Sequence, residues 1–487
     1  MSAPSRSRWL MRGLLLFVLA FANLNDIWSP DVLPNALFTF TVVREADVDY
    51  DEFVMRPAER DRLADVTTTD AMRGAKLDSE AYFFRACGKS TATAPPKTTR
   101  SPGGPPAPGP NDHVCSIFPP GMALLAFPFF LPFALSGAEA LDLGLLLRVG
   151  HVAAAVVETI ATLLLWSVLR RFVSERWALA LMLLYFLGTS VRTIASQALW
   201  QHAGVHLAIA GALWLVLVER PVNLRREALA GLALGLGGVA RQTTVLVSLG
   251  MSGSFFVRPL AVLAAFAGAA VGLLPLLLFN WFAFGSPLEQ GYGTKPFDTP
   301  LLEGLAGLLL APSRGLFVYE PWALLALGAL AVALWTSRRA GDRLGPLLLV
   351  WILLLLLYST YAEWWGGRVF GPRFLDDLAP VLIVGLASGI SRGMLLNTAL
   401  RVFFWLSAAW SFLIFNAAAF VYDQSWDTYP TNVNFDASRL WSWSDPQWLA
   451  VLRALPGGGA RVVVAAGLTA LALLLLLRIE RVIASRR

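Results

Sequence analysis

The amino-acid sequence predicts an all-α polytopic membrane protein with about 12 transmembrane helices, in a range of about 11 to 13. Its 487 residues are 56% hydrophobic and only 15% charged, whereas soluble proteins are about one quarter charged. Apolar runs long enough to cross a bilayer recur along the whole chain. A transmembrane β-barrel would show short alternating segments instead, so we expect helices throughout.

The predicted spans follow the apolar runs in order. They lie near 10–28, 143–168, 177–195, 203–218, 227–240, 242–257, 259–279, 316–335, 344–360, 374–390, 399–421 and 461–478. The two spans on either side of Arg241 could instead form one bent helix. Residues 118–135 are apolar but contain four prolines, which suits a re-entrant or surface-lying helix better than a full span.

Basic residues in short loops predict which side of the membrane each loop faces. With 12 spans, the basic N-terminus, the loops RRFVSER, ERPVNLRRE and SRRAGDR and the tail RIERVIASRR fall on one side. Such residues mark the cytoplasmic side, so both termini are expected in the cytoplasm. The bias toward Ala, Leu, Arg and Gly is typical of a GC-rich bacterial genome, which suggests a bacterial inner membrane. The working face is expected outside, where the loops are long, aromatic and rich in Gly and Pro.

This topology divides the chain into a short series of parts. They are a first transmembrane helix (1–28), an extracytoplasmic loop with juxtamembrane helices and a Pro/Gly linker (29–142), a helical core (143–421), an extracytoplasmic segment (422–460) and a last transmembrane helix with a basic tail (461–487). Cys87 and Cys115, the two cysteines of the chain, both fall in the exported loop. They could form a disulfide there or remain two free thiols.

Acidic residues stand where the first span leaves the membrane. Asp26 or Asp31 could act as a general base toward an acceptor, or help to hold a divalent metal; the simpler alternative is a helix cap or a solvated acid. The 361–380 segment, YAEWWGGRVFGPRFLDDLAP, adds Asp376 and Asp377 between two apolar runs. These acids could orient arginines or bind a metal such as Mg²⁺ or Mn²⁺.

Arginines are the second group of candidates, because a guanidinium fork matches a phosphate. The candidates for binding a donor phosphate are Arg373, Arg148, Arg368 and Arg314. The alternative for each is an ion pair with Glu289, Glu320, Asp376 or Asp377. Candidates for binding the remaining substrate come from the same outer loops and are His202, Gln201, Trp364, Trp365, Gln290 and Lys295. His202 could equally be a satisfied interfacial histidine, and most tryptophans are expected in the interfacial belt.

The sequence lacks the motifs of several classes of enzyme. No H-E-x-x-H, C-x-x-C, G-x-S-x-G or GxxxxGK[ST] occurs, so zinc hydrolases, serine hydrolases and ATP-driven motors have no support. The net charge of +6 is explained by cytoplasmic loop arginines, and no basic run interleaved with aromatic residues indicates nucleic-acid binding.

The order of these features resembles the GT-C superfamily of membrane glycosyltransferases, in particular the bacterial protein-mannosyltransferase-like and aminoarabinose-transferase-like branches (glycosyltransferase family 39-like). A first span is followed at once by an acid in a long exported loop, then by an apolar helix opened by PPG at 119–121, then by a span opened by Arg148. The stretches SPDVLPNALF, SQALWQHAG, FGSPLEQGYG and WWGGRVFGPRFLDDLAP extend the resemblance over nearly the whole chain.

The resemblance implies inverting transfer of a sugar from a polyprenyl-phosphate donor to an extracytoplasmic glycan, lipid or protein, with membrane lipids as further partners and no nucleic acid. The family's catalytic acid maps to Asp31, with Asp26 second, and its outer arginine to Arg148. Protein mannosyltransferases carry an Asp-Glu pair where this chain does not, so metal dependence and the acceptor stay open. The assignment of Arg373 to the donor phosphate does not come from the family; it rests on the position of Arg373 in the 361–380 segment. The alternatives are a lipid-linked saccharide transporter or flippase, and a non-catalytic envelope-assembly protein.

Overall fold

The computed structural model describes residues 6–25, 29–55, 76–79, 81–88, 108–218, 223–253, 258–293, 296–336 and 343–485. Helices dominate this part of the chain, as predicted. Strands occur only as two small pairs within the described residues. β1 (Val54–Met55) pairs in parallel with β2 (Leu77–Asp78), and β3 (Phe84–Ala86) pairs antiparallel with β4 (Val114–Ser116).

The helices follow the apolar runs. Those before residue 220 are α1 (Arg6–Phe21), α2 (Leu33–Arg44), α4 (Gly121–Leu135), α5 (Leu143–Leu169), α6 (Glu175–Leu187) and α7 (His202–Leu217). Those of the middle region are α8 (Leu224–Ala240), α9 (Ser248–Met251), α10 (Pro259–Phe284), α11 (Leu301–Leu310), α12 (Leu316–Tyr319) and α13 (Ala323–Thr336). The remaining helices are α14 (Gly345–Ser359), α15 (Arg373–Asp376), α16 (Ala379–Ser391), α17 (Thr398–Val421), α18 (Ser425–Thr428), α19 (Gln447–Ala454) and α20 (Gly459–Ser485).

Four helical stretches are long and apolar enough to cross a membrane by themselves. They are α5, α10, α17 and the run Gln447–Ile479, which contains α19 and most of α20. A further seven apolar helices among the described residues are shorter, with 10 to 17 residues. These lengths mark the chain as a helical membrane protein.

Four predicted spans are not continuous helices, and one of them is the span near 374–390, which is divided between α15 and α16. The span near 177–195 ends as α6 at Leu187 and resumes as a π-helical turn over Val191–Ala195. The span near 316–335 is broken between α12 and α13, where Pro321 follows Glu320. In its described residues, 242–253, the span near 242–257 holds a 3-10 turn (Gln242–Val247) and α9, because Arg241 is extended and β-branched residues, which disfavour helix, follow it.

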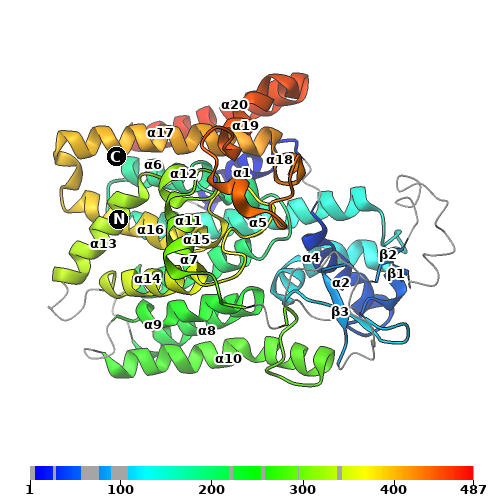
Figure 1. The fold of residues 1–487 in the computed structure, drawn as a ribbon. Coiled ribbons are helices and arrows are strands. Elements are labelled where there is room, and N and C mark those ends of the chain that lie inside the picture. Colours follow the sequence, from blue (N-terminus) through cyan, green and yellow to red (C-terminus); the bar gives the residue numbers. More distant parts are fainter. Residues whose placement is uncertain are drawn as a thin grey trace.

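The helices lie side by side in one bundle (Figure 1). The exported loop predicted over 29–142, drawn in blue to cyan, lies at the right-hand end of this bundle, together with α2, α4 and the strands. Both marked chain ends lie toward the left-hand end. The described part of residues 29–142 therefore lies at one end of the molecule.

Helices α8 and α10 approach each other through glycines. A Cβ atom on Gly231 or Gly235 of α8 would lie 1.8 or 2.2 Å from the carbonyl oxygen of Ala265 or Ala269 of α10, and one on Gly268 of α10 would lie 1.9 Å from that of Ala228. Small residues at such spacing let membrane helices pack backbone against backbone. This contact fixes α8, and hence Arg241 at its end.

We expect Gly268→Ala to lower the free energy of unfolding by about 1–3 kcal/mol, because the added methyl group must push α8 and α10 apart. Thermal unfolding followed by tryptophan fluorescence in detergent would measure this. Gly211→Ala on α7 is the matched control, since a Cβ atom added there would meet no atom within 4 Å. Equal melting temperatures for the two variants would contradict the close packing.

Candidate functional site

Asp31 and Arg373 meet although 342 residues separate them in the chain. Asp31 lies in a short 3-10 turn (Pro30–Val32) just beyond α1, and Arg373 begins α15. The Arg373 Nη1 atom lies 4.0 Å from Asp31 Oδ2, and both side chains are largely buried. The Tyr82 hydroxyl donates a hydrogen bond to Asp31 Oδ1. Burial, and then the neighbouring Asp31 carboxylate, raise the pKa of Tyr82 well above its ordinary value, so the phenol stays protonated and remains a donor.

The glycine pair of the 361–380 segment shapes the backbone around Arg373. Gly366 and Gly367 have φ angles of +77° and +81°, which side chains rarely adopt. The Gly366 carbonyl accepts a hydrogen bond of 2.9 Å from Arg373 Nη1. A Cβ atom on Gly366 would also stand 3.3 Å from Arg373 Cδ. Gly366 is therefore needed for two reasons. It adopts a positive φ angle, and a side chain at this position would crowd the side chain of Arg373.

Arg373 is joined to Arg241 through two further side chains. Its Nε donates to His202 Nε2 at 2.8 Å, His202 Nδ1 lies 2.6 Å from Asp377 Oδ1, and Arg241 Nη1 lies 3.2 Å from Asp377 Oδ2. We call Asp31, Arg373, His202, Asp377 and Arg241 the Asp31–Arg241 cluster. Two guanidinium groups face two carboxylates in it, so the cluster is close to electrically balanced.

Aromatic side chains enclose the cluster. The Arg241 guanidinium lies over Phe374 and Tyr358, with 4.8 and 5.4 Å to the ring centroids. On another side, Gln201 Nε2 donates to the Tyr292 hydroxyl at 2.7 Å, and the Tyr292 ring contacts Phe118. Burial raises the pKa of Tyr292 to about 12. These rings shield the charges from solvent, which strengthens their interactions.

Arg368 borders the cluster from the same loop as Arg373. Its side chain is half-buried, and its positive charge lowers the pKa of Tyr82, against the larger raising effects of burial and Asp31. A small apolar pocket begins directly after Asp31 in the chain. It is lined by Val32 and Leu33 at the start of α2 and by Leu146, Leu147 and Gly150 of α5.

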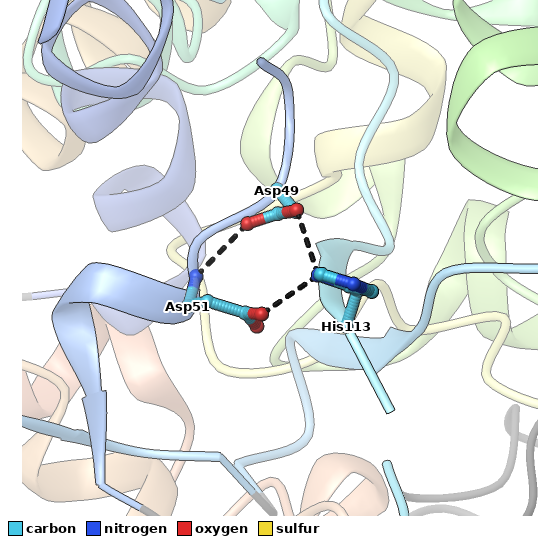
Figure 2. Close-up of side chains that lie close together, drawn as sticks. All are labelled: Asp49, Asp51 and His113. Atoms are coloured by element: carbon cyan, nitrogen blue, oxygen red, sulfur yellow. Dashed lines mark hydrogen bonds and ion pairs between the residues drawn. The ribbon is translucent and has the colours of Figure 1, made fainter. Parts of the chain in front are cut away.

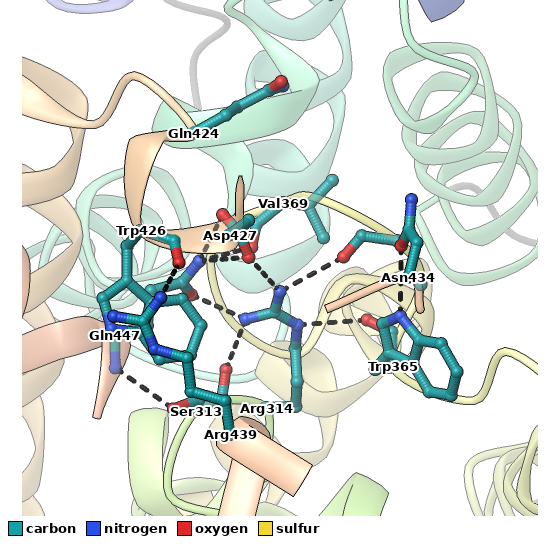
Figure 3. Close-up of polar contacts among 12 residues, drawn as sticks. Ser313, Arg314, Trp365, Val369, Gln424, Trp426, Asp427, Asn434, Arg439 and Gln447 are labelled. Atoms are coloured by element: carbon teal, nitrogen blue, oxygen red, sulfur yellow. Dashed lines mark hydrogen bonds and ion pairs between the residues drawn. The ribbon is translucent and has the colours of Figure 1, made fainter. Parts of the chain in front are cut away.

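Arg314 belongs to a different, fully buried network (Figure 3). Its Nε donates to the Trp365 carbonyl at 3.1 Å, Nη1 to Ser313 O and Gln447 Oε1, and Nη2 to Gly367 O and, at 2.6 Å, to Asp427 Oδ1. A guanidinium has five N–H donors, and each has a protein acceptor here. Arg314 thus ties the 361–380 segment to α18 and α19 and has no donor left for a ligand.

Trp364 and Trp365 of the 361–380 segment both contact other parts of the protein. Trp364 is 1% exposed and lies against Gly307, where a Cβ atom would stand 2.6 Å from its ring. Trp365 is half-buried and its indole N–H donates to Asn434 Oδ1 at 3.4 Å. Both rings therefore support the loop, and Trp365 alone keeps some accessible surface.

Four other predicted residues lie apart from the cluster or cannot be placed. Arg148 is on α5 with an exposed side chain, and Gln290 is exposed too. The Gln290 carbonyl accepts a hydrogen bond of 2.9 Å from Arg85 Nη1, which holds its loop against β3. Asp26 and Lys295 lie outside the residues that the structure describes.

Asp376 and Asp377, the predicted metal ligands, have protein partners. Asp377 is shared between His202 and Arg241, and Asp376 Oδ2 accepts from the Ser190 backbone N–H at 3.0 Å. Within the described residues, the grouping whose ligand atoms all lie within 4.8 Å of one another is Asp49, Asp51 and His113 (Figure 2). His113 Nδ1 lies 3.1 and 2.8 Å from the two carboxylates. This group offers ligand types that suit a divalent cation, but it is largely open to solvent.

Cys87 and Cys115 are joined by a disulfide with 5.1 Å between their Cα atoms. The bond links the end of strand β3 to strand β4. Next to it, the Gly88 N–H donates to the Ala283 carbonyl at 2.9 Å. The disulfide and this hydrogen bond therefore hold the segment that carries Tyr82 close to the end of α10.

Sequence reasoning did not find every member of the site. Tyr82, Tyr292 and His206 were not singled out, and Arg241 was not among the arginines predicted to bind the donor phosphate. One signal was present, since His202 and His206 stand four residues apart on α7 and so share one helix face. A comparison with known proteins adds nothing to this geometry, since no family model, curated protein or solved structure matches the chain.

Proposed function

We propose that the chain is an integral membrane glycosyltransferase. It moves a sugar from a polyprenyl-phosphate donor to an extracytoplasmic acceptor by inverting transfer. The observation that carries this proposal is the meeting of Asp31 with Arg373. A carboxylate beside an arginine is the pair that such a reaction needs, because a proton is removed from the acceptor while phosphate is released.

In the proposed reaction, Asp31 accepts the proton of the acceptor hydroxyl. The acceptor oxygen forms a bond to the anomeric carbon, and the bond from that carbon to the phosphate oxygen breaks. The polyprenyl phosphate leaves with the electron pair of that bond. Arg373, with Arg368 beside it, compensates the negative charge that grows on the phosphate.

The finer features of the sequence prediction belong to the same proposal. They are a GT-C-like arrangement of about 12 spans, a bacterial inner membrane, cytoplasmic termini and an outward-facing site. The reaction described for these residues does not require a metal ion. Adding a chelator to the assay below tests whether Mg²⁺ or Mn²⁺ is needed as well. No specific contact favours the transporter or the assembly protein over the transferase.

Release of free polyprenyl phosphate tests the proposal. The purified protein would be incubated with a bacterial membrane lipid extract shown to contain lipid-linked sugars, and the product would be followed by mass spectrometry. We expect release by the wild type and none by Arg373→Gln. Arg453→Gln, an exposed arginine on α19, is the matched control and should release as the wild type does. No release by the wild type across a panel of acceptors would move the assignment to a transporter or an assembly protein.

A further inference from the structure

We infer that His202 and Asp377 form a positioning device that holds the Arg373 guanidinium in the orientation that binds phosphate. The inference rests on the proposed function and names the residues that prepare its anion site. Neither His202 nor Asp377 is assigned a contact with substrate, because their side chains are only 1% and 6% exposed. Both are therefore positioning residues that act through Arg373.

The direction of the hydrogen bonds fixes the protonation of His202. A guanidinium can only donate, so His202 Nε2, 2.8 Å from Arg373 Nε, must be the acceptor and carries no proton. The ring proton is then on Nδ1 and is donated to Asp377 Oδ1 at 2.6 Å. His202 is thus a neutral imidazole, and Asp377 selects this tautomer in the way a carboxylate orients a catalytic or metal-binding histidine.

Asp377 is itself held in place. Arg241 Nη1 lies 3.2 Å from its other oxygen, and the Arg241 guanidinium lies over the Phe374 ring. A buried carboxylate is costly without a positive partner, and Arg241 supplies it. The order Arg241, Asp377, His202, Arg373 therefore runs from a charge fixed at the break after α8 to the arginine of the site.

These contacts leave one edge of Arg373 for a ligand. His202 takes Nε and the Gly366 carbonyl takes Nη1, and Nη2 has no hydrogen-bond partner among the described residues. A side chain held at two of its three nitrogens loses little further freedom when an anion binds at the third. Preparation of this kind is expected of a group that must meet charge developing during a reaction.

A second histidine of α7 holds the backbone of the same segment. One turn after His202, His206 Nε2 lies 3.0 Å from the Asp376 carbonyl oxygen and must donate to it. His206 Nδ1 lies 3.0 Å from Glu158 Oε2, and the Tyr185 hydroxyl donates to Glu158 Oε1 at 2.8 Å. Since α15 has only four residues, these two histidines give it the rigidity that its own helical hydrogen bonds cannot.

A double-mutant cycle on anion binding tests the inference. Farnesyl phosphate, a short prenyl phosphate, would be titrated into the detergent-solubilised full chain and its Kd measured for wild type, His202→Phe, Arg373→Gln and the double variant. We expect His202→Phe to weaken binding about tenfold, as for the loss of one charge-assisted hydrogen bond. In the Arg373→Gln background the same change should have no further effect, because His202 acts through Arg373.

A rescue variant separates positioning from folding. His202→Gln keeps a side-chain oxygen that can accept from Arg373 Nε, so it should bind farnesyl phosphate more tightly than His202→Phe does. His202→Ala, which also removes the acceptor, takes the place of His202→Phe in the cycle should the Phe variant not fold. Additive effects of His202 and Arg373, with the wild type binding the probe, would overturn the positioning role and leave the proposed function standing. A folded wild type that does not bind farnesyl phosphate would overturn both.

Discussion

An Asp31→Asn variant is expected to transfer sugar about 10³-fold more slowly than the wild type, the usual loss when a general base is removed. Asparagine has the same shape and can still accept the hydrogen bond of Tyr82, so the fold should be kept. What it cannot do is take the proton of the acceptor. The rate of polyprenyl phosphate release under saturating donor measures the effect.

The same variant should not weaken donor binding. Asp31 Oδ2 lies 4.0 Å from Arg373 Nη1, so the carboxylate competes with phosphate for the arginine. Its removal should leave the Kd for farnesyl phosphate unchanged or lower it, while the turnover falls. A tenfold or larger rise of that Kd would make Asp31 a binding residue. Turnover within tenfold of the wild type would remove it from the reaction.

Tyr82→Phe is the graded control for Asp31. It removes one hydrogen bond to the carboxylate but leaves the carboxylate itself. We expect a loss of about tenfold or less in turnover, in keeping with one lost hydrogen bond. A loss as large as that of Asp31→Asn would point to the phenol, and not the carboxylate, as the group that handles the proton.

The sequence pointed to four members of the Asp31–Arg241 cluster but did not place Arg241 among the candidate site residues. Asp31 was reached from its position after the first span, and Arg373 from its unusual place between two apolar runs. Both arguments rest on the high cost of a charge near a membrane. The same cost applies to Arg241, whose role became visible only through its contact with Asp377. A charged residue within an apolar stretch is expected to have a partner of opposite charge, but the local sequence does not identify that partner.

Trp364, which the sequence predicted to bind substrate, is buried in the structure. Dense aromatic residues beside glycines favour either a sugar platform or close packing, and the two cannot be told apart without knowing what faces the ring. Here Gly307 of α11 faces Trp364. The pairing depends on α11 being brought against the 361–380 segment, which is a property of the whole fold. His202, predicted to bind substrate, contacts Arg373 and Asp377 in the structure.

Arg314 gives the sharpest contrast between a binding and a structural arginine. We expect Arg314→Met to destabilise the fold by about 3–5 kcal/mol, the cost of leaving a buried charge without its partner. Asp427, which is 0% exposed, would keep only Gln447 and Tyr422 as hydrogen-bond donors. The carbonyl groups of Trp365 and Gly367 would lose their donors too, so the loop that carries Arg373 should loosen.

Thermal unfolding and the yield of monodisperse protein in detergent would measure this loss. The matched comparison is Arg373→Gln, which should lose farnesyl phosphate binding but less stability than Arg314→Met, because Arg373 has two protein hydrogen bonds to lose and Arg314 has five. The double variant Arg314→Met/Asp427→Leu should recover part of the stability, since it removes both charges together. The opposite outcome for Arg314→Met is an unchanged melting temperature together with a loss of farnesyl phosphate binding. It would show that Arg314 does not stabilise Asp427 and would return Arg314 to the donor site.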